Sequence, residues 1–161
     1  MNAKNIFYVL TCISFCLILG AATYEHIAVW PNAYSEPPRS LTMFQGPYAL
    51  ESAPFWMWVH PVTLLLFLAT LGLNWRTEKK KYILLPLAVY FLVLATTFIY
   101  FVPELMNLTH TPYADTVDVS VQERAGRWTS LSLVRAAFLY VSAFLLRMGL
   151  PRPEKKIHTV S

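Results

Sequence analysis

The sequence predicts an all-α, polytopic membrane protein: a bundle of four transmembrane helices with an outer capping loop. Of its 161 residues, 56% are hydrophobic, and they gather in four blocks, 6–23, 55–73, 82–102 and 131–148. Each block approaches the roughly 20 residues that a helix needs to cross about 30 Å of hydrocarbon. The blocks do not alternate as barrel strands do, and lipid admits only helices or closed barrels. The length fits one integral membrane domain, residues 1–161.

The first predicted helix covers residues 6–28, and one alternative stays open for it. Lys4, the apolar stretch and the small residues "GAA" also resemble a secretory signal that is cleaved after Ala22. The apolar character resumes at Ile27–Trp30, which favours an uncleaved helix.

The other predicted helices cover residues 55–75, 82–104 and 124–148, and the last has an alternative start near Val119. The short loop "NWRTEKKKY" makes the second and third helices antiparallel neighbours. The connection 29–54 is too apolar for a solvated linker. We interpret it as a cap on the outer face of the bundle that contains one short helix.

Charge and tryptophan placement predict how the bundle lies in the membrane. Nine basic residues flank one side of it: Lys4, Arg76, Lys79, Lys80, Lys81, Arg147, Arg152, Lys155 and Lys156. Only Arg39, Arg124 and Arg127 flank the other side, so both termini are expected to be cytoplasmic, in a bacterial inner membrane. The net charge of +4 thus reflects orientation and argues against a nucleic-acid partner. Four tryptophans near the outer boundary predict an interfacial belt: Trp30, Trp56, Trp58 and Trp128.

Polar residues of the predicted helices are concentrated toward the outer side. Glu25 and His26 end the first helix, and each of the other helices carries one polar stripe at helical spacing. The stripes are His60, Thr63, Phe67, Thr70 and Asn74; Thr97, Tyr100, Glu104 and Asn107; and Arg124, Arg127, Leu131 and Arg135. A charge at mid-bilayer costs at least ~2.5 kcal/mol unless it is paired or hydrated. We therefore expect the stripes to line an outward-opening polar cavity inside the bundle.

The chemistry of these residues has two functional interpretations. Imidazole and carboxylate groups suit iron, copper or zinc, which gives a metal-ligand set of Glu25, His26, His60 and Glu104. The same chemistry suits acid–base catalysis, which gives a catalytic set of Glu25, His60, Glu104 and Arg135, with Arg135 as the anchor of a substrate oxygen. The candidate substrate-binding residues are Tyr24, Tyr100, Asn107, Arg127 and Trp128.

Structural interpretations of the same residues also stay open. Glu104 with Arg127 or Arg135 would form a buried ion pair that fixes the register of two helices. His26 would lie in the headgroup region with its polar atoms in water. His60, which precedes Pro61, would be hydrogen-bonded inside the bundle.

Three segments of the chain carry a family resemblance. They are "YEHIAVWP" at the end of the first helix, "FVPELMNL" at the end of the third, and "GRWTSLSLVRAAFLYVSAFLL" in the fourth. From about Gly20 to Leu150, the chain resembles the anthrone oxygenase-like family of small four-helix membrane proteins. The resemblance implies an aromatic or quinone-like ligand, since fungal members oxidise anthrones to anthraquinones with dioxygen. The chain departs from the family's Glu-His-Pro run, because a proline follows Glu25-His26 only at Pro31.

Two hypotheses follow for the function. In the first, the protein is a membrane oxygenase or oxidoreductase that acts on a hydrophobic aromatic substrate entering from the outer leaflet. In the second, it is a non-enzymatic accessory or lipid-binding subunit whose polar cluster is structural. The expected partners are membrane lipids, a hydrophobic small molecule, and a second copy of the chain or a partner membrane subunit.

Overall fold

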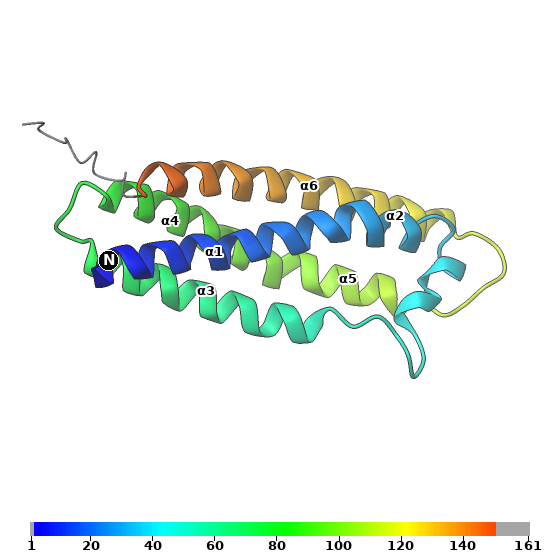
Figure 1. The fold of residues 1–161 in the computed structure, drawn as a ribbon. Coiled ribbons are helices and arrows are strands. Elements are labelled where there is room, and N and C mark those ends of the chain that lie inside the picture. Colours follow the sequence, from blue (N-terminus) through cyan, green and yellow to red (C-terminus); the bar gives the residue numbers. More distant parts are fainter. Residues whose placement is uncertain (1, 151–161) are drawn as a thin grey trace, which may run out of the picture.

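The computed structural model describes residues 2–150. Figure 1 shows long helical segments packed side by side, with the longer loops gathered at one end. The described residues form helices and no strands, and four helical segments are long and apolar enough to cross a membrane. The predicted all-α fold with four such segments is confirmed. Three residues of the predicted basic side lie outside the described residues: Arg152, Lys155 and Lys156.

Two of these segments are built from several helical elements in a row. The first comprises α1 (Ala3–Tyr24), the π-helical turn η1 (Glu25–Val29) and α2 (Trp30–Ala33). The third comprises α4 (Lys80–Thr96), the π-helical turn η3 (Thr97–Phe101) and α5 (Val102–Thr109). The second and fourth are single helices, α3 (Ala53–Leu73) and α6 (Val119–Met148). The first and third segments therefore continue past their predicted ends, and α6 has the earlier of its two predicted starts.

The helices pack in a ring in which each one contacts two neighbours. Both α1 and α4 pack against α3 and against α6, so the expected contact between α3 and α4 is confirmed. In the core, the ring of Phe15 meets the rings of Phe67 and Tyr90 edge to face, with centroids 5.4 Å apart in both pairs. Such pairs add about 0.5–1.5 kcal/mol each beyond the burial of their area.

Pairs of hydroxyl groups join α1 to α3 inside the bundle. The hydroxyls of Thr11 and Thr70 share a hydrogen bond of 2.8 Å, and Ser14 shares one with Thr63. All four side chains are buried. Small hydroxyl residues let helices approach closely in lipid, and the pairing satisfies polar groups that hydrocarbon cannot. The polar stripe predicted for the second helix therefore faces the interior.

Each π-helical turn ends two residues before a proline. Trp30 closes η1 before Pro31, and Val102 closes η3 before Pro103, in both cases with a backbone hydrogen bond to the residue five positions earlier. Proline has no amide hydrogen, and its ring clashes with the carbonyl four residues earlier in a regular helix. A widened turn accommodates one extra residue at this point. The helix can then continue through the proline.

The loop between α2 and α3 forms a cap at one end of the bundle and includes the 3-10 helix η2 (Arg39–Phe44). Leu41 is fully buried there, in an apolar cluster that also holds Trp30 and Trp128. These two tryptophans are only 3% and 2% exposed. Their predicted place in an interfacial belt is therefore wrong, because both rings are buried in the apolar cluster at the capped end of the bundle.

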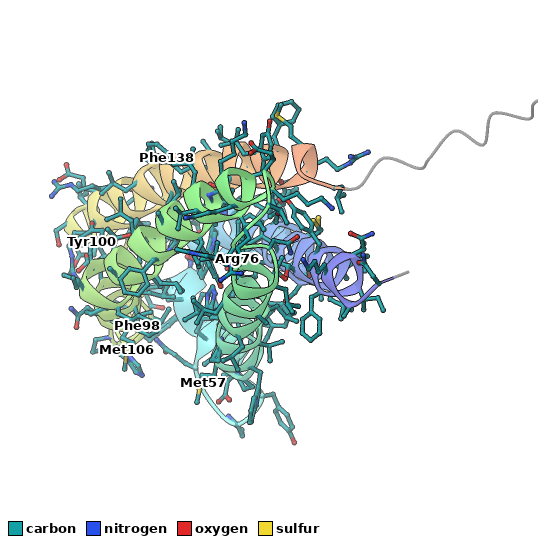
Figure 2. The ribbon with its side chains drawn as sticks, turned by 90° about the vertical axis from the view of Figure 1, so that its left-hand side faces the viewer. Met57, Arg76, Phe98, Tyr100, Met106 and Phe138 are labelled. Carbon is teal, nitrogen blue, oxygen red and sulfur yellow. The ribbon has the colours of Figure 1, made fainter. Side chains whose placement is uncertain are left out.

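Large apolar side chains also cover the outside of the bundle. Figure 2 shows Met57, Phe98 and Phe138 on the outer sides of their helices, and each is more than half exposed. A continuous apolar surface of this kind is unfavourable in water. Such a surface suits contact with hydrocarbon, and the four helical segments are long and apolar enough to cross a membrane.

We expect Thr70→Val to destabilise the bundle, because it removes the hydroxyl that bonds Thr11 and nearly preserves the side-chain volume. The expected loss is about 0.6 kcal/mol and at most about 1.7 kcal/mol. Reversible unfolding in mixed micelles measures it. Thr96→Val is the control, since Thr96 is exposed and its hydroxyl bonds a carbonyl of its own helix. Equal losses in the two variants would contradict an interhelical role.

Candidate functional site

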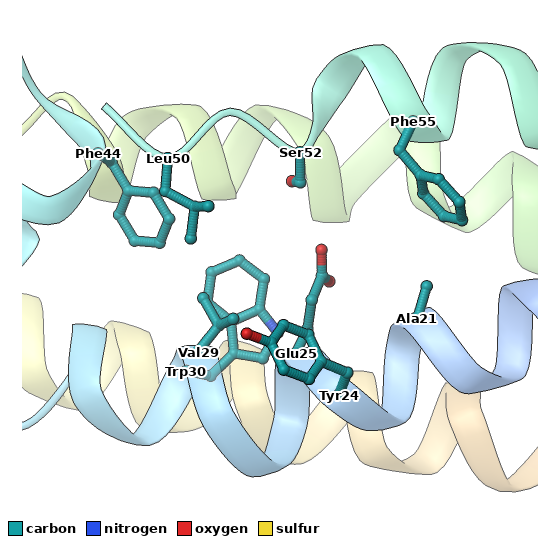
Figure 3. A pocket seen from close by; sticks show the side chains of 9 residues that line it. All are labelled: Ala21, Tyr24, Glu25, Val29, Trp30, Phe44, Leu50, Ser52 and Phe55. Carbon is teal, nitrogen blue, oxygen red and sulfur yellow. The ribbon is translucent and has the colours of Figure 1, made fainter. Parts of the chain in front are cut away.

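A pocket of about 190 Å³ lies between the first helical segment, the cap and the start of α3. Figure 3 shows the carboxylate of Glu25 projecting from η1 into this space, toward Ser52. The other lining residues are apolar or aromatic: Ala21, Tyr24, Val29, Trp30, Phe44, Leu50 and Phe55. The pocket thus presents one carboxylate and the hydroxyls of Ser52 and Tyr24 within a largely apolar wall.

An indole from α3 holds the carboxylate of Glu25. The Nε1–H of Trp56 donates a hydrogen bond to Glu25 Oε1 at 2.9 Å. Trp56 also stacks on His60, one helical turn further along, with ring centroids 5.2 Å apart. His60 Nδ1 in turn shares a hydrogen bond of 2.8 Å with the hydroxyl of Tyr90 on α4. A row of contacts therefore links Glu25 to α4, and His60 reaches Glu25 only through Trp56.

Arg135 extends into the bundle from α6. Its guanidinium donates hydrogen bonds to the hydroxyls of Thr97 and Ser132, both at 2.9 Å. It also lies over the ring of Phe101, 4.0 Å from the ring centroid, which is a favourable cation–π contact. Within residues 2–150 it forms no ion pair.

Glu104 belongs to a separate polar contact between the third and fourth segments. Both of its carboxylate oxygens accept hydrogen bonds from Arg124, at 2.8 and 3.0 Å. The predicted buried ion pair of Glu104 with Arg127 or Arg135 is therefore wrong, because Glu104 pairs instead with Arg124, whose side chain is partly exposed. Glu104 does not line the Glu25 pocket, so the expectation of one cavity shared by all the polar stripes is wrong.

The inward face of α6 differs from the predicted stripe. Arg127 and Leu131 are exposed, whereas Ala125 and Trp128 are buried. Trp128 donates its indole N–H to the backbone carbonyl of Phe101 at 2.9 Å, which is a structural contact. The prediction followed the charges, but Arg127 lies on the outside of α6 while a small and an aromatic residue fill the interior.

The remaining candidate substrate-binding residues are placed differently from one another. Tyr24 lines the pocket and is 65% exposed. Tyr100 is half-buried against Phe101 and is not a lining residue. Asn107 is exposed near the end of α5. Only Tyr24 of the five is therefore positioned to contact a molecule in the pocket.

The four predicted metal ligands are not brought together. Across the described part of the chain, no three His, Cys, Asp or Glu side chains are grouped so as to hold a metal ion. Glu104 is bound by Arg124, and His26 uses Nδ1 to bond the carbonyl of Ala22 at 2.7 Å. The chemistry that the arrangement does offer is that of a single carboxylate beside an indole.

Several side chains of the site were not predicted as site residues. Trp56 precedes His60 by four residues, so helical spacing places both on one face, and this signal was present in the sequence. Tyr90 gave no signal, since it lies within a continuous apolar run. Ser52 lies in a loop whose path the sequence does not indicate.

The fold and the pocket together define a helical bundle of the membrane-spanning type with one carboxylate-bearing pocket under its cap. A scan of protein-family models, a search of curated proteins and a search of solved structures each found no match to this chain. The functional argument therefore depends on the residues of the pocket and their contacts.

We expect Tyr90→Phe to destabilise the bundle by about 0.6 kcal/mol and at most about 1.7 kcal/mol, because His60 loses its interhelical hydrogen bond. Unfolding in mixed micelles is again the measurement. Tyr48→Phe is the matched control, since Tyr48 lies in the cap loop and is 98% exposed. If Tyr90→Phe is as stable as the control variant, the bond between His60 and Tyr90 does not hold α3 to α4.

Proposed function

We propose that this protein is an integral membrane oxidoreductase or oxygenase that binds a hydrophobic aromatic or quinone-like compound in the Glu25 pocket. Glu25 accepts a proton from the bound compound, and Arg135 stabilises the negative charge that results. The observation that carries the proposal is a single carboxylate set in an apolar, largely aromatic pocket. Apolar pockets with a few placed polar groups are the usual form of small-molecule sites.

The size of the pocket favours a flat ring over a larger ligand. An apolar cavity of about 150 Å³ accommodates benzene, and this pocket has about 190 Å³. One aromatic ring thus fits beside Glu25, and the rest of the molecule extends past the exposed rings of Tyr24 and Phe55. This arrangement suits a ligand that arrives from the lipid.

The polar neighbours of Glu25 favour proton transfer. Trp56 fixes one carboxylate oxygen by its N–H, which orients the carboxylate toward the pocket. Arg135 is not a lining residue of the pocket, but it forms no ion pair within the described residues, so in this proposal its charge acts on the bound anion from behind the lining. Since the proposed metal ligands are not grouped, iron, copper or zinc has no assigned place in this proposal.

The resemblance to the anthrone oxygenase-like family points to the same ligand class. In the reaction that the family implies, the methylene group of anthrone is oxidised to a carbonyl group. One atom of dioxygen becomes the new carbonyl oxygen, and the other atom leaves as water with the two methylene hydrogens. Removal of the first proton is the step that a carboxylate base would assist. His60 is then a positioning residue, because it acts on Glu25 through Trp56.

We expect Glu25→Gln to lower the rate of anthraquinone formation from anthrone under air by about 10²- to 10⁴-fold, the usual contribution of a general base. Glutamine keeps an oxygen to accept the Trp56 hydrogen bond but cannot take the proton. The assay follows anthraquinone absorbance with purified protein in detergent. Glu51→Gln, at an exposed residue outside the pocket lining, is the control and should react as wild type does.

A non-enzymatic accessory or lipid-binding subunit is the second candidate. The observation in its favour is that contacts such as His60 with Tyr90 and Arg124 with Glu104 join helices and suffice as structural links. On this alternative, wild type and Glu25→Gln form anthraquinone no faster than buffer. A partner membrane subunit or a second copy of the chain would then be sought at the cap.

The orientation that we propose has both termini in the cytoplasm of a bacterial inner membrane. The described basic residues support it, since Lys4, Lys79, Lys80 and Arg147 lie at the end of the bundle opposite the cap. Short loops rich in lysine and arginine stay on the cytoplasmic side.

A fusion of green fluorescent protein after residue 161 is therefore expected to fluoresce in bacteria, and alkaline phosphatase fused at the same place is expected to be inactive. Fluorescence requires a cytoplasmic location, whereas the phosphatase requires export. The two reporters used together control for expression. An active phosphatase with a dark fluorescent protein would reverse the proposed orientation.

A further inference from the structure

Three polar atoms at the end of the first helical segment and directly after it are buried and have no hydrogen-bond partner among the described residues. They are Nε2 of His26, Nε1 of Trp30 and the hydroxyl of Tyr34. His26 lies in η1, Trp30 begins α2 and Tyr34 directly follows α2, so successive members are about one turn apart and project to nearly the same side of the segment. The rings of Trp30 and Tyr34 are stacked, with centroids 5.6 Å apart.

The hydrogen-bonding character of these atoms can be assigned. His26 Nδ1 lies 2.7 Å from the carbonyl oxygen of Ala22, which can only accept, so Nδ1 carries the hydrogen. Nε2 of the neutral ring is then an acceptor. The indole of Trp30 can only donate, and the phenol of Tyr34 can donate. This face therefore offers one acceptor and two donors.

Trp128 shows that the bundle can satisfy a buried indole. It is 2% exposed, and its N–H donates to the carbonyl of Phe101. Trp30 is 3% exposed and in contact with Trp128, yet its N–H has no such bond within the described residues. Buried donors in proteins are nearly always paired with protein or ordered water. Two indoles in the same apolar cluster are thus equally buried, but only the N–H of Trp128 has a hydrogen-bond acceptor within the described residues.

We propose that the face formed by His26, Trp30 and Tyr34 binds hydroxyl groups inside the capped end of the bundle. A hydroxyl donates one hydrogen bond and accepts two, which complements one acceptor and two donors. Its source is either internal water or the hydroxyl of a hydrophobic alcohol or phenol. The site goes beyond the proposed function because it does not require Glu25, although Trp30 also lines the pocket.

Indole N–H signals in ¹⁵N–¹H spectra of the full chain in detergent micelles test the proposal. The Trp30→Phe variant assigns the Trp30 signal. A magnetisation-exchange cross-peak between water and the Trp30 N–H, with none at Trp128, identifies water as the source. Without that cross-peak, a Trp30 shift with 1-naphthol but not with naphthalene identifies a ligand hydroxyl. If neither signal is seen, the proposal is overturned.

The 1-naphthol titration keeps this site separate from the Glu25 pocket. A shift at the Trp56 N–H, which donates to Glu25, reports on the pocket, whereas a shift at Trp30 reports on the hydroxyl-binding face. Stability gives a second test. Tyr34→Phe should raise the unfolding equilibrium constant about fivefold if the phenol is bonded to a hydroxyl. An unchanged or smaller constant would show a phenol without a partner and would overturn the proposal.

Discussion

The structure depends on one constraint: a polar group inside hydrocarbon must find its hydrogen-bond partner within the protein. Helices meet this constraint for the backbone, and the side chains follow it as well. The Thr11–Thr70 pair, the bond from Trp128 to a backbone carbonyl, and the two hydroxyls on Arg135 are all partners of this kind. Apart from the bond between Arg135 and Ser132, which lies within α6, these bonds join different helical segments, so the same requirement that makes the segments helical also helps to fix how they pack.

Two prolines change the helix geometry because each removes one backbone hydrogen-bond donor. Pro31 and Pro103 each remove an amide donor from a long helix, and in both places the preceding turn widens. Glu25 is the first residue of one widened turn and Thr97 is the first residue of the other. Thr97 accepts a hydrogen bond from Arg135. Glu25 and Thr97 therefore make their polar contacts where the helices depart from regular geometry, whereas the pair of Glu104 and Arg124 joins two regular helices.

The sequence was sufficient for the number and class of the helices, because a long apolar run has few alternatives in lipid. It was also sufficient for the inward face of α3, where helical spacing and burial agree. It failed for α6, since arginine reaches water from several helix faces and so does not mark the interior. The sequence also did not indicate that Glu104 and Glu25 belong to two different polar sites. Their separation depends on the cap and on the extension of the helices beyond the prolines, which hydropathy does not report.

The position of the pocket beside exposed Tyr24 and Phe55 has a consequence for how affinity is measured. A compound that enters from lipid is first concentrated there by its partition coefficient. Each added methylene favours transfer from water by about 0.8 kcal/mol, or roughly fourfold. In a series of ligands with longer and longer alkyl tails, the apparent affinity therefore increases with tail length when the ligand concentration is expressed per volume of water. Expressed as mole fraction in the bilayer, the same series would reveal the selectivity of the pocket for the ring.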